Sequence, residues 1–233
     1  MNKLFLFVIA SLILSDVSGQ YTQTVTPVLD QQAGTMKELH PKPEGVKGSV
    51  YLNDDWISSD FYLKPGTFAV NTFENVPIKL DMKSNTLEIN TKEGIKVLDG
   101  SKIQRFEWVN PQNNQKEEYT NCDAFMFEGT HLNGFCKISG EGVKLIQRHY
   151  VEILKADYNV SLDVGNKEDR IIKKMGFYLL RGNKIVEYDK KSLYETMSDK
   201  AKEIKKFIKD NNIKTSKEEG LEKVVDYYNS LNK

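Results

Sequence analysis

The 233-residue sequence has few of the residues that build common catalytic and metal centres. It holds two cysteines and three histidines, and they show no ligand spacing. Four further signatures are missing: the Gly-x-Ser-x-Gly elbow, the phosphate-binding loop, the dinucleotide-binding glycine pattern and His-Glu-x-x-His. The sequence therefore predicts no catalytic residues, no cofactor and no bound metal, and we expect a protein that is not an enzyme.

The chain also lacks an excess of charge of either sign. Lys and Arg together number 33, as do Asp and Glu, so the formal net charge is zero. A field that would attract nucleic acid or an anionic bilayer is therefore not expected. We expect the partner to be a protein or an apolar ligand, and we expect no nucleic acid.

Long hydrophobic runs are missing too, apart from one at the start. Residues 4–14 form an apolar run that follows Lys3 and precedes the small residues Ser18 and Gly19. This is the arrangement of a secretory signal peptide, and the run is shorter than the ~20 apolar residues that a membrane-spanning helix needs. We predict cleavage near Gly19 and a mature chain without a membrane span, periplasmic or secreted; a membrane anchor is the alternative.

The two cysteines, Cys122 and Cys136, would both meet an oxidising compartment in an exported protein. We predict a disulfide between them, with two buried free thiols as the alternative. A bridged thiol cannot act as a nucleophile beside His131 or His149. A single histidine in a strand is usually structural, so we assign His149 no catalytic role.

Alternating apolar residues dominate residues 48–189. In the stretch 76–108 they recur at every second position, in four short segments separated by polar or Gly-bearing turns. The segments contain Ile78, Leu80 and Met82; Leu87 and Ile89; Ile95 and Val97; Phe106 and Trp108. The pattern predicts an antiparallel meander, either flat, curved or a half-barrel. Further strands are expected at 118–127, 134–139 and 143–156, and a hairpin at 177–188.

From residue 190 the apolar spacing changes from two to between three and four, which is typical of amphipathic helices. Ser192 is expected to cap a short helix, and Ser198 to begin a longer one. Ser216 and Glu219 have the spacing of a capping box at the start of the last helix. The segment therefore predicts a helical hairpin packed on the sheet.

These patterns predict an α+β fold in four parts. The parts are a signal peptide over 1–19, an extended arm or linker over 20–47, an antiparallel β domain over 48–189 and the helical hairpin over 190–233. One helix face is basic, which is typical of a solvated surface, with a patch for an acidic partner as the alternative. Its residues are Lys200, Lys202, Lys205, Lys206 and Lys209.

Eight short stretches, spread over almost the whole predicted mature chain, share a pattern with known proteins. They are residues 48–54, 76–80, 134–136, 144–146, 176–178, 184–187, 205–208 and 227–231. The pattern resembles a broad family of uncharacterised exported proteins of Bacteroidota-type bacteria. The resemblance implies a periplasmic or secreted protein with a β-rich body and a helical tail, and it carries no activity.

The function that follows is an exported, non-catalytic binding or interaction protein of the bacterial envelope, with an unknown ligand. Two alternatives stay open: a periplasmic protein that carries a lipid or lipoprotein in a curved sheet, and a hydrolase with an unrecognised site. An open apolar cavity on the aromatic face of the sheet would favour ligand binding. A face filled by the protein's own helices would favour the interaction role.

Overall fold

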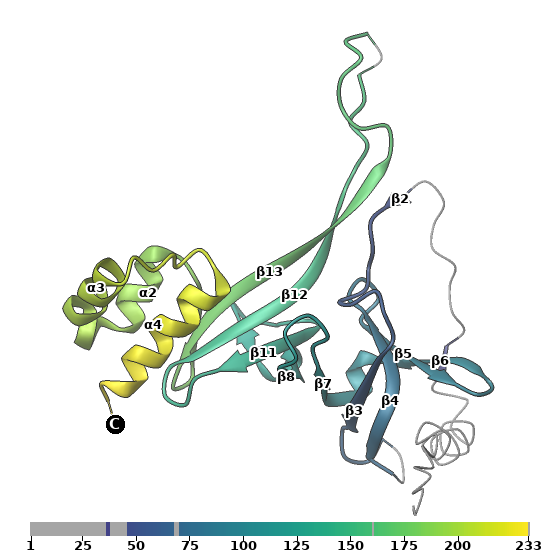
Figure 1. The fold of residues 1–233 in the computed structure, drawn as a ribbon, viewed down its shortest axis with the longest axis horizontal. Coiled ribbons are helices and arrows are strands. Elements are labelled where there is room, and N and C mark those ends of the chain that lie inside the picture. Colours follow the sequence, from purple (N-terminus) through teal and green to yellow (C-terminus); the bar gives the residue numbers. More distant parts are fainter. Residues whose placement is uncertain (1–35, 38–45, 68–69, 160, 233) are drawn as a thin grey trace, which may run out of the picture.

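The computed structural model describes residues 36–37, 46–67, 70–159 and 161–232 (Figure 1). The predicted signal peptide, its cleavage site near Gly19 and most of the 20–47 arm lie outside the described residues. The described chain forms a twelve-stranded mixed sheet, a separate two-stranded sheet and a C-terminal group of helices. The predicted α+β class with helices after the strands is confirmed, and the large sheet is not closed into a barrel.

The first half of the sheet contains five strands that surround an aromatic core. Their spatial order is β6-β5-β4-β3-β7, with antiparallel pairing throughout. The strands are β3 (Ile57–Leu63), β4 (Thr72–Asp81), β5 (Thr86–Thr91), β6 (Gly94–Asp99) and β7 (Ile103–Val109). The predicted meander is therefore correct for three strands and wrong for the fourth, because β7 pairs with β3 and not with β6.

A short 3₁₀ turn, η2 (Gly100–Lys102), moves the chain from β6 across to β7. The buried Asn121 amide fixes this turn by donating to the carbonyls of Gly100 and Ile103, both at 2.9 Å. Gly100 lies so close to Asn85 that an added Cβ would be 2.5 Å from its carbonyl oxygen. These contacts involve residues distant in sequence, which the local alternation of apolar residues does not encode.

The second half of the large sheet continues from β7 in the order β8-β11-β12-β13-β14. The strands are β8 (Lys116–Asn121), β11 (Phe135–Ser139), β12 (Lys144–Leu154), β13 (Asp169–Arg181) and β14 (Lys184–Glu187). Two short strands from the predicted arm join the same sheet: β1 (Met36–Lys37) pairs with β6, and β2 (Val46–Lys47) pairs in parallel with β13. This parallel pair makes the sheet mixed, but the other pairings of the large sheet are antiparallel, so the mainly antiparallel sheet that the sequence predicts is confirmed among the described residues.

The predicted strand over 118–127 is interrupted after Asn121. A 3₁₀ turn, η3 (Cys122–Ala124), follows β8, and the Asn121 side chain accepts from the Asp123 backbone N–H at 3.1 Å. The chain then forms the small sheet of β9 (Met126–Phe127) and β10 (Thr130–His131). Asn121 thus ends the strand by competing for backbone hydrogen bonds.

Strands β12 and β13 form a long ribbon that leaves the body of the molecule (Figure 1). Eleven residue pairs join them, from Lys144 with Leu180 to Leu154 with Arg170. One half of the ribbon lies within the sheet between β11 and β14, whereas the other half points away from it. We call the described residues of the connection at its far end, 155–159 and 161–168, the ribbon tip.

The C-terminal helices lie together at the opposite end of the ribbon (Figure 1). They are α2 (Lys190–Thr196), η4 (Ser198–Lys200), α3 (Ala201–Asp210) and α4 (Glu218–Ser230). Their apolar faces share a buried cluster with Leu145 of β12 and Leu179 of β13. Among the described residues, no helix is both long enough and apolar enough to cross a bilayer.

Two of the predicted helix caps are wrong. Asp189, not Ser192, caps α2, and Ser192 is the third residue of its capping box. The capping box predicted from Ser216 is also not formed, because α4 begins after Lys217, without a side-chain cap. The start of α4 is set instead by tertiary contacts of its first turn, described below.

Candidate functional site

The structure places Cys122 and Cys136 at disulfide distance, with their Cα atoms 5.4 Å apart. The pair joins η3 to β11, next to the β8–β11 pairing. His131 is exposed in β10, and its Nδ1 lies 2.6 Å from the Asp123 carbonyl oxygen. The structure therefore does not assemble a thiolate and histidine into a nucleophilic pair among the described residues.

His149 lies on β12, on the face that it shares with buried Leu145 and Gln147, as the alternation predicts. Its ring packs edge-to-face on Tyr119 of β8, with centroids 5.6 Å apart. Burial lowers the pKa of His149, although the Glu218 carboxylate opposes the shift. The imidazole is therefore neutral at pH 7. Its Nε2 is buried and has no hydrogen-bond partner among the described residues.

A polar hollow of about 240 Å³ lies beside His149. It forms where β7, β8, β11, β12 and β13 meet the first turn of α4 and three loops, at residues 52–53, 82 and 110–112. Ser, Thr and Cys are absent from the described residues that line it. The lining residues are Leu52, Asn53, Met82, Trp108, Asn110, Gln112, Glu117, Tyr119, Lys137, His149, Lys173, Lys174 and Glu218.

Glu117 of β8 is the most heavily hydrogen-bonded group in the polar hollow. Its Oε2 accepts from Trp108 Nε1 at 3.2 Å and from the Tyr119 hydroxyl at 3.0 Å. Its Oε1 accepts from Asn110 Nδ2 at 3.1 Å. Burial alone would raise the pKa of Glu117, but these donors and the charge of Lys137 outweigh it and lower the pKa. The carboxylate is therefore ionised and engaged at both oxygens.

Lys137 of β11 lies between two carboxylates. Its Nζ donates to Glu218 Oε1 at 2.7 Å and lies 3.7 Å from Glu117 Oε1. Burial would lower the pKa of Lys137, but Glu218 and Glu117 reverse the shift and raise it. This ammonium is thus charged and committed to protein partners.

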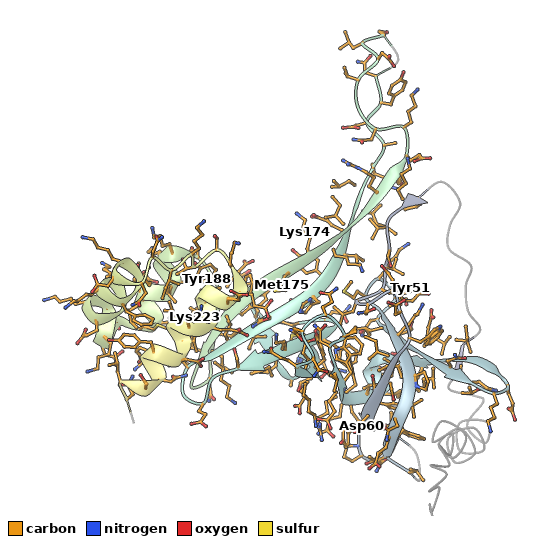
Figure 2. The ribbon with its side chains drawn as sticks, viewed as in Figure 1. Tyr51, Asp60, Lys174, Met175, Tyr188 and Lys223 are labelled. Atoms are coloured by element: carbon orange, nitrogen blue, oxygen red, sulfur yellow. A yellow bond between two sulfur atoms is a disulfide. The ribbon has the colours of Figure 1, made fainter. Side chains whose placement is uncertain are left out.

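Two further lysines stand at the rim of the polar hollow, on the ribbon strand β13. Lys173 lies 3.6 Å from Asp54, and Lys174 lies 3.2 Å from Glu152. Both side chains are about half exposed, and Figure 2 shows Lys174 on β13 between the helices and the ribbon tip. The ammonium groups of Lys173 and Lys174 are therefore more exposed than that of Lys137 and make longer contacts with their carboxylate partners.

The aromatic face of the sheet is filled by the protein's own side chains. Phe61 stacks on Phe73 with centroids 4.7 Å apart, and Phe106 contacts Phe135 at 5.2 Å and Tyr119 at 5.0 Å. Each of these rings is at most 4% exposed. The aromatic residues form a packed core, and strand neighbours rather than helices fill this face.

The ribbon tip exposes apolar side chains to solvent. Leu162 is 69% exposed and Val164 is 55% exposed, while Leu154 at the end of β12 is 39% exposed. A local hydrogen bond closes the turn: the backbone N–H of Asn159 donates to the backbone carbonyl of Val164 at 2.8 Å. The described residues of the tip thus carry hydrophobic groups away from the body.

The lysine-rich face predicted around α3 lies on the outside of the helical group. Lys202, Lys205, Lys206 and Lys209 are exposed, whereas Ile204 of the same helix is fully buried. Lys205 places its ammonium 4.9 Å from the centroid of the Tyr194 ring. This distribution is that of an ordinary solvated helix face.

The disulfide pair and His149 stand out in the sequence, but the residues that surround this histidine in the fold do not. Glu117 could have been recognised from the sequence as an inward-facing charged residue, because it alternates along its strand with Tyr119 and Asn121, which are buried. The sequence gives no indication that Lys137 and Glu218 pair, because they are 81 residues apart and meet only in the folded chain.

Comparison with protein-family models, curated proteins and solved structures finds no match for this chain. The resemblance to a Bacteroidota exported family stays a prediction.

Proposed function

We propose that this chain is an exported, non-catalytic binding or interaction protein of the bacterial envelope that contacts a protein partner through its ribbon tip. The observation that carries the proposal is the projecting ribbon, whose end exposes Leu162 and Val164. Burying exposed apolar side chains of this kind is the main driving force of protein association. The cysteine pair at disulfide distance fits an oxidising compartment.

The packed aromatic core favours this role over that of a lipid carrier. A carrier needs an apolar cavity for an acyl chain, but the rings of Phe61, Phe106 and Phe135 fill the aromatic face of the sheet as part of one packed core. The polar hollow does not supply such a cavity, because charged and amide side chains make up most of its lining. It also offers no Ser, Thr or Cys nucleophile among the described residues, which weighs against a hydrolase that forms a covalent intermediate on such a side chain.

Site-specific photocross-linking in cells of the native host tests the proposal. A photoreactive amino acid at Leu162 should give one discrete adduct with a protein partner. The matched control carries the same group at Lys191, which is 83% exposed on α2. Adducts that are equal at both positions, or none at Leu162, would contradict the proposed contact.

A second measurement addresses the lipid-carrying alternative. Native mass spectrometry of protein purified from the same host should give the mass of the mature chain alone. A bound mass that organic solvent extracts would favour the carrier and count against the interaction role.

A further inference from the structure

We infer that the open edge of the ribbon strand β12 is a strand-binding site, and that residues 21–26 of the same chain occupy it. The inference does not depend on which protein contacts the ribbon tip. It starts from the pairing of β12, which differs in length on its two sides. β13 pairs with β12 along all eleven residues, whereas β11 pairs only with Leu145–Arg148. Among the described residues, no strand continues beside β12 on that side from His149 to Leu154.

Two residues of this open stretch point their backbone hydrogen-bonding groups to the side on which no described strand lies. The carbonyl oxygen of His149 faces the loop before β11, because a Cβ added at Gly134 would lie 3.7 Å from it. Backbone groups of alternate residues in a strand point to the same side, so those of Val151 and Ile153 point there as well. Each therefore offers an N–H donor and a C=O acceptor to an added strand.

The open stretch of β12 lacks the features that commonly protect a free edge, which are lysine, proline and β-bulges. Residues 149–154 contain no lysine or proline, and their pairing with β13 shows no shift of register. Their one charged side chain, Glu152, lies 3.2 Å from Lys174 of β13. By contrast, the open stretch of β13 carries Lys173 and Lys174, and the edge strand β14 is only four residues long. The β12 edge is thus the least protected of the three.

The arm before β3 already supplies strands to two other edges of the same sheet. β1 pairs with β6, and β2 pairs with β13 near the tip end of the ribbon. Lys47 of β2 pairs with Arg170, which in turn pairs with Leu154 of β12. A strand added beside β12 would therefore lie three strand spacings, about 14 Å, from β2. The arm thus runs close to the edge that we infer it covers.

Residues 21–26 have the composition of a strand that can be added to such an edge. Their sequence is Tyr-Thr-Gln-Thr-Val-Thr, which alternates threonine with larger side chains and is rich in residues that favour strands. Residues 17–29 contain no charged residue, in a chain that is 28% charged. Pro27 lacks a backbone N–H and would end the pairing after Thr26. The segment also matches the open stretch 149–154 in length.

The length of the chain between this segment and β1 fits pairing within one molecule. The connection 27–35 precedes β1, and the shorter connection 38–45 joins β1 to β2 on the ribbon. The longer connection spans up to about 33 Å when extended, so it can return to the ribbon as the shorter one does. Tethering raises the effective concentration of the segment to about the millimolar range, which favours its own chain over a second copy.

Hydrogen exchange of the purified protein, measured residue by residue in NMR, tests the inference. The amides of Val151 and Ile153 should exchange at least about tenfold more slowly than those of Lys173 and Met175. The latter two are the internal reference, because they point outward on the open stretch of β13, as the Ile171 carbonyl does. Equal exchange of both pairs would show an uncovered β12 edge and overturn the inference.

Proline substitutions identify the segment that protects the two β12 amides. In the double variant Gln23→Pro/Thr24→Pro, both adjacent N–H groups are lost, so the one that faces β12 is removed whichever it is. The two amides should then exchange as fast as the reference pair. The matched control Gln31→Pro/Gln32→Pro changes the connection to β1 and should leave them protected. Protection that persists in the first variant would show that another segment covers the edge and reject the inference.

A photoreactive amino acid at Val25 identifies the copy that supplies the segment. Unlabelled protein and protein labelled with nitrogen-15 are mixed in urea, refolded together and irradiated. The cross-link should join the peptide with Val25 to the peptide with residues 149–154 of the same isotope. Adducts of mixed isotope would assign the edge to a second copy, and adducts elsewhere would place the segment elsewhere; either result would overturn the inference.

Discussion

Lys137 of β11 and Glu218 in the first turn of α4 are 81 residues apart in the sequence and joined by a hydrogen bond of 2.7 Å. A second bond of the same length links Gln147 of β12 to Glu222 one turn later. Both carboxylates also lie near the start of α4, where the helix dipole favours negative charge. The last helix is thus fastened to the sheet by polar contacts at its first two turns.

Removing the ammonium of this link should destabilise the fold. Lys137→Met leaves Glu218 and Glu117 without their shared cation, and we expect the free energy of unfolding to fall by about 1–3 kcal/mol. Urea unfolding followed by circular dichroism measures it. The control Lys191→Met removes an exposed contact to Glu195 and should change stability by less than about 0.5 kcal/mol. Similar losses in both variants would contradict a special role for Lys137.

Gly220→Ala should destabilise the protein although alanine is the better helix former. Helix propensity alone predicts a gain of about 1 kcal/mol. An added Cβ would instead lie 2.2 Å from the Lys214 carbonyl oxygen, so the chain before α4 would have to move. We expect a net loss of more than about 1 kcal/mol in the same assay. Glu219→Ala, at the exposed neighbouring position, is the control and should be near neutral.

Stability should fall as the pH is lowered from 7 to 5. The pKa of folded His149 lies below that of the unfolded chain, about 6.5, so the unfolded state binds the proton first. The groups that face the ring are Glu218, Lys137, Glu117 and Tyr119. Glu117 adds a further loss below about pH 4.5, because its folded pKa is also lowered.

The variant His149→Asn separates the two effects. Between pH 7 and 5 its free energy of unfolding should change less than that of the wild type, whereas the loss below pH 4.5 should remain. If the free energy of unfolding fell equally in both proteins between pH 7 and 5, His149 would not be the source of the loss of stability.

Loss of the cysteine pair should destabilise the chain by about 3 kcal/mol, the chain-entropy estimate for a loop of about 15 residues. The two cysteines are 14 positions apart. The double variant Cys122→Ala/Cys136→Ala and the reduced wild type should have the same urea midpoint. Reductant should have no effect on the double variant. A wild type that is unaffected by reductant would show that no bridge forms.

The parts of this fold that sequence predicts are those set by local spacing. Apolar alternation located β4, β5 and β6, and the change of period at residue 190 located the helices. The position of β7 was not predictable, because the Asn121 side chain and the close approach at Gly100 determine it. The start of α4 was missed for the same reason, since its first turn has no side-chain cap and is held by the contact of Glu218 with Lys137, 81 residues away.

The candidate site was less predictable than the fold. Its groups come from five strands, one helix and three loops, and each residue alone looks like an ordinary surface or strand residue. Glu117 was the exception, as a charged residue at an inward position between aromatic ones. A site whose residues are far apart in the sequence shows no regular spacing by which it could be recognised.

The ribbon has a mechanical consequence. The same eleven antiparallel pairs form the floor beneath the helices and the shaft that carries Leu162 outward. Neither strand is interrupted by a loop or hinge along this length. The far turn is therefore joined to the strands beneath α4 by one continuous run of paired backbone, so any displacement of the turn acts on the same two strands on which the last helix rests.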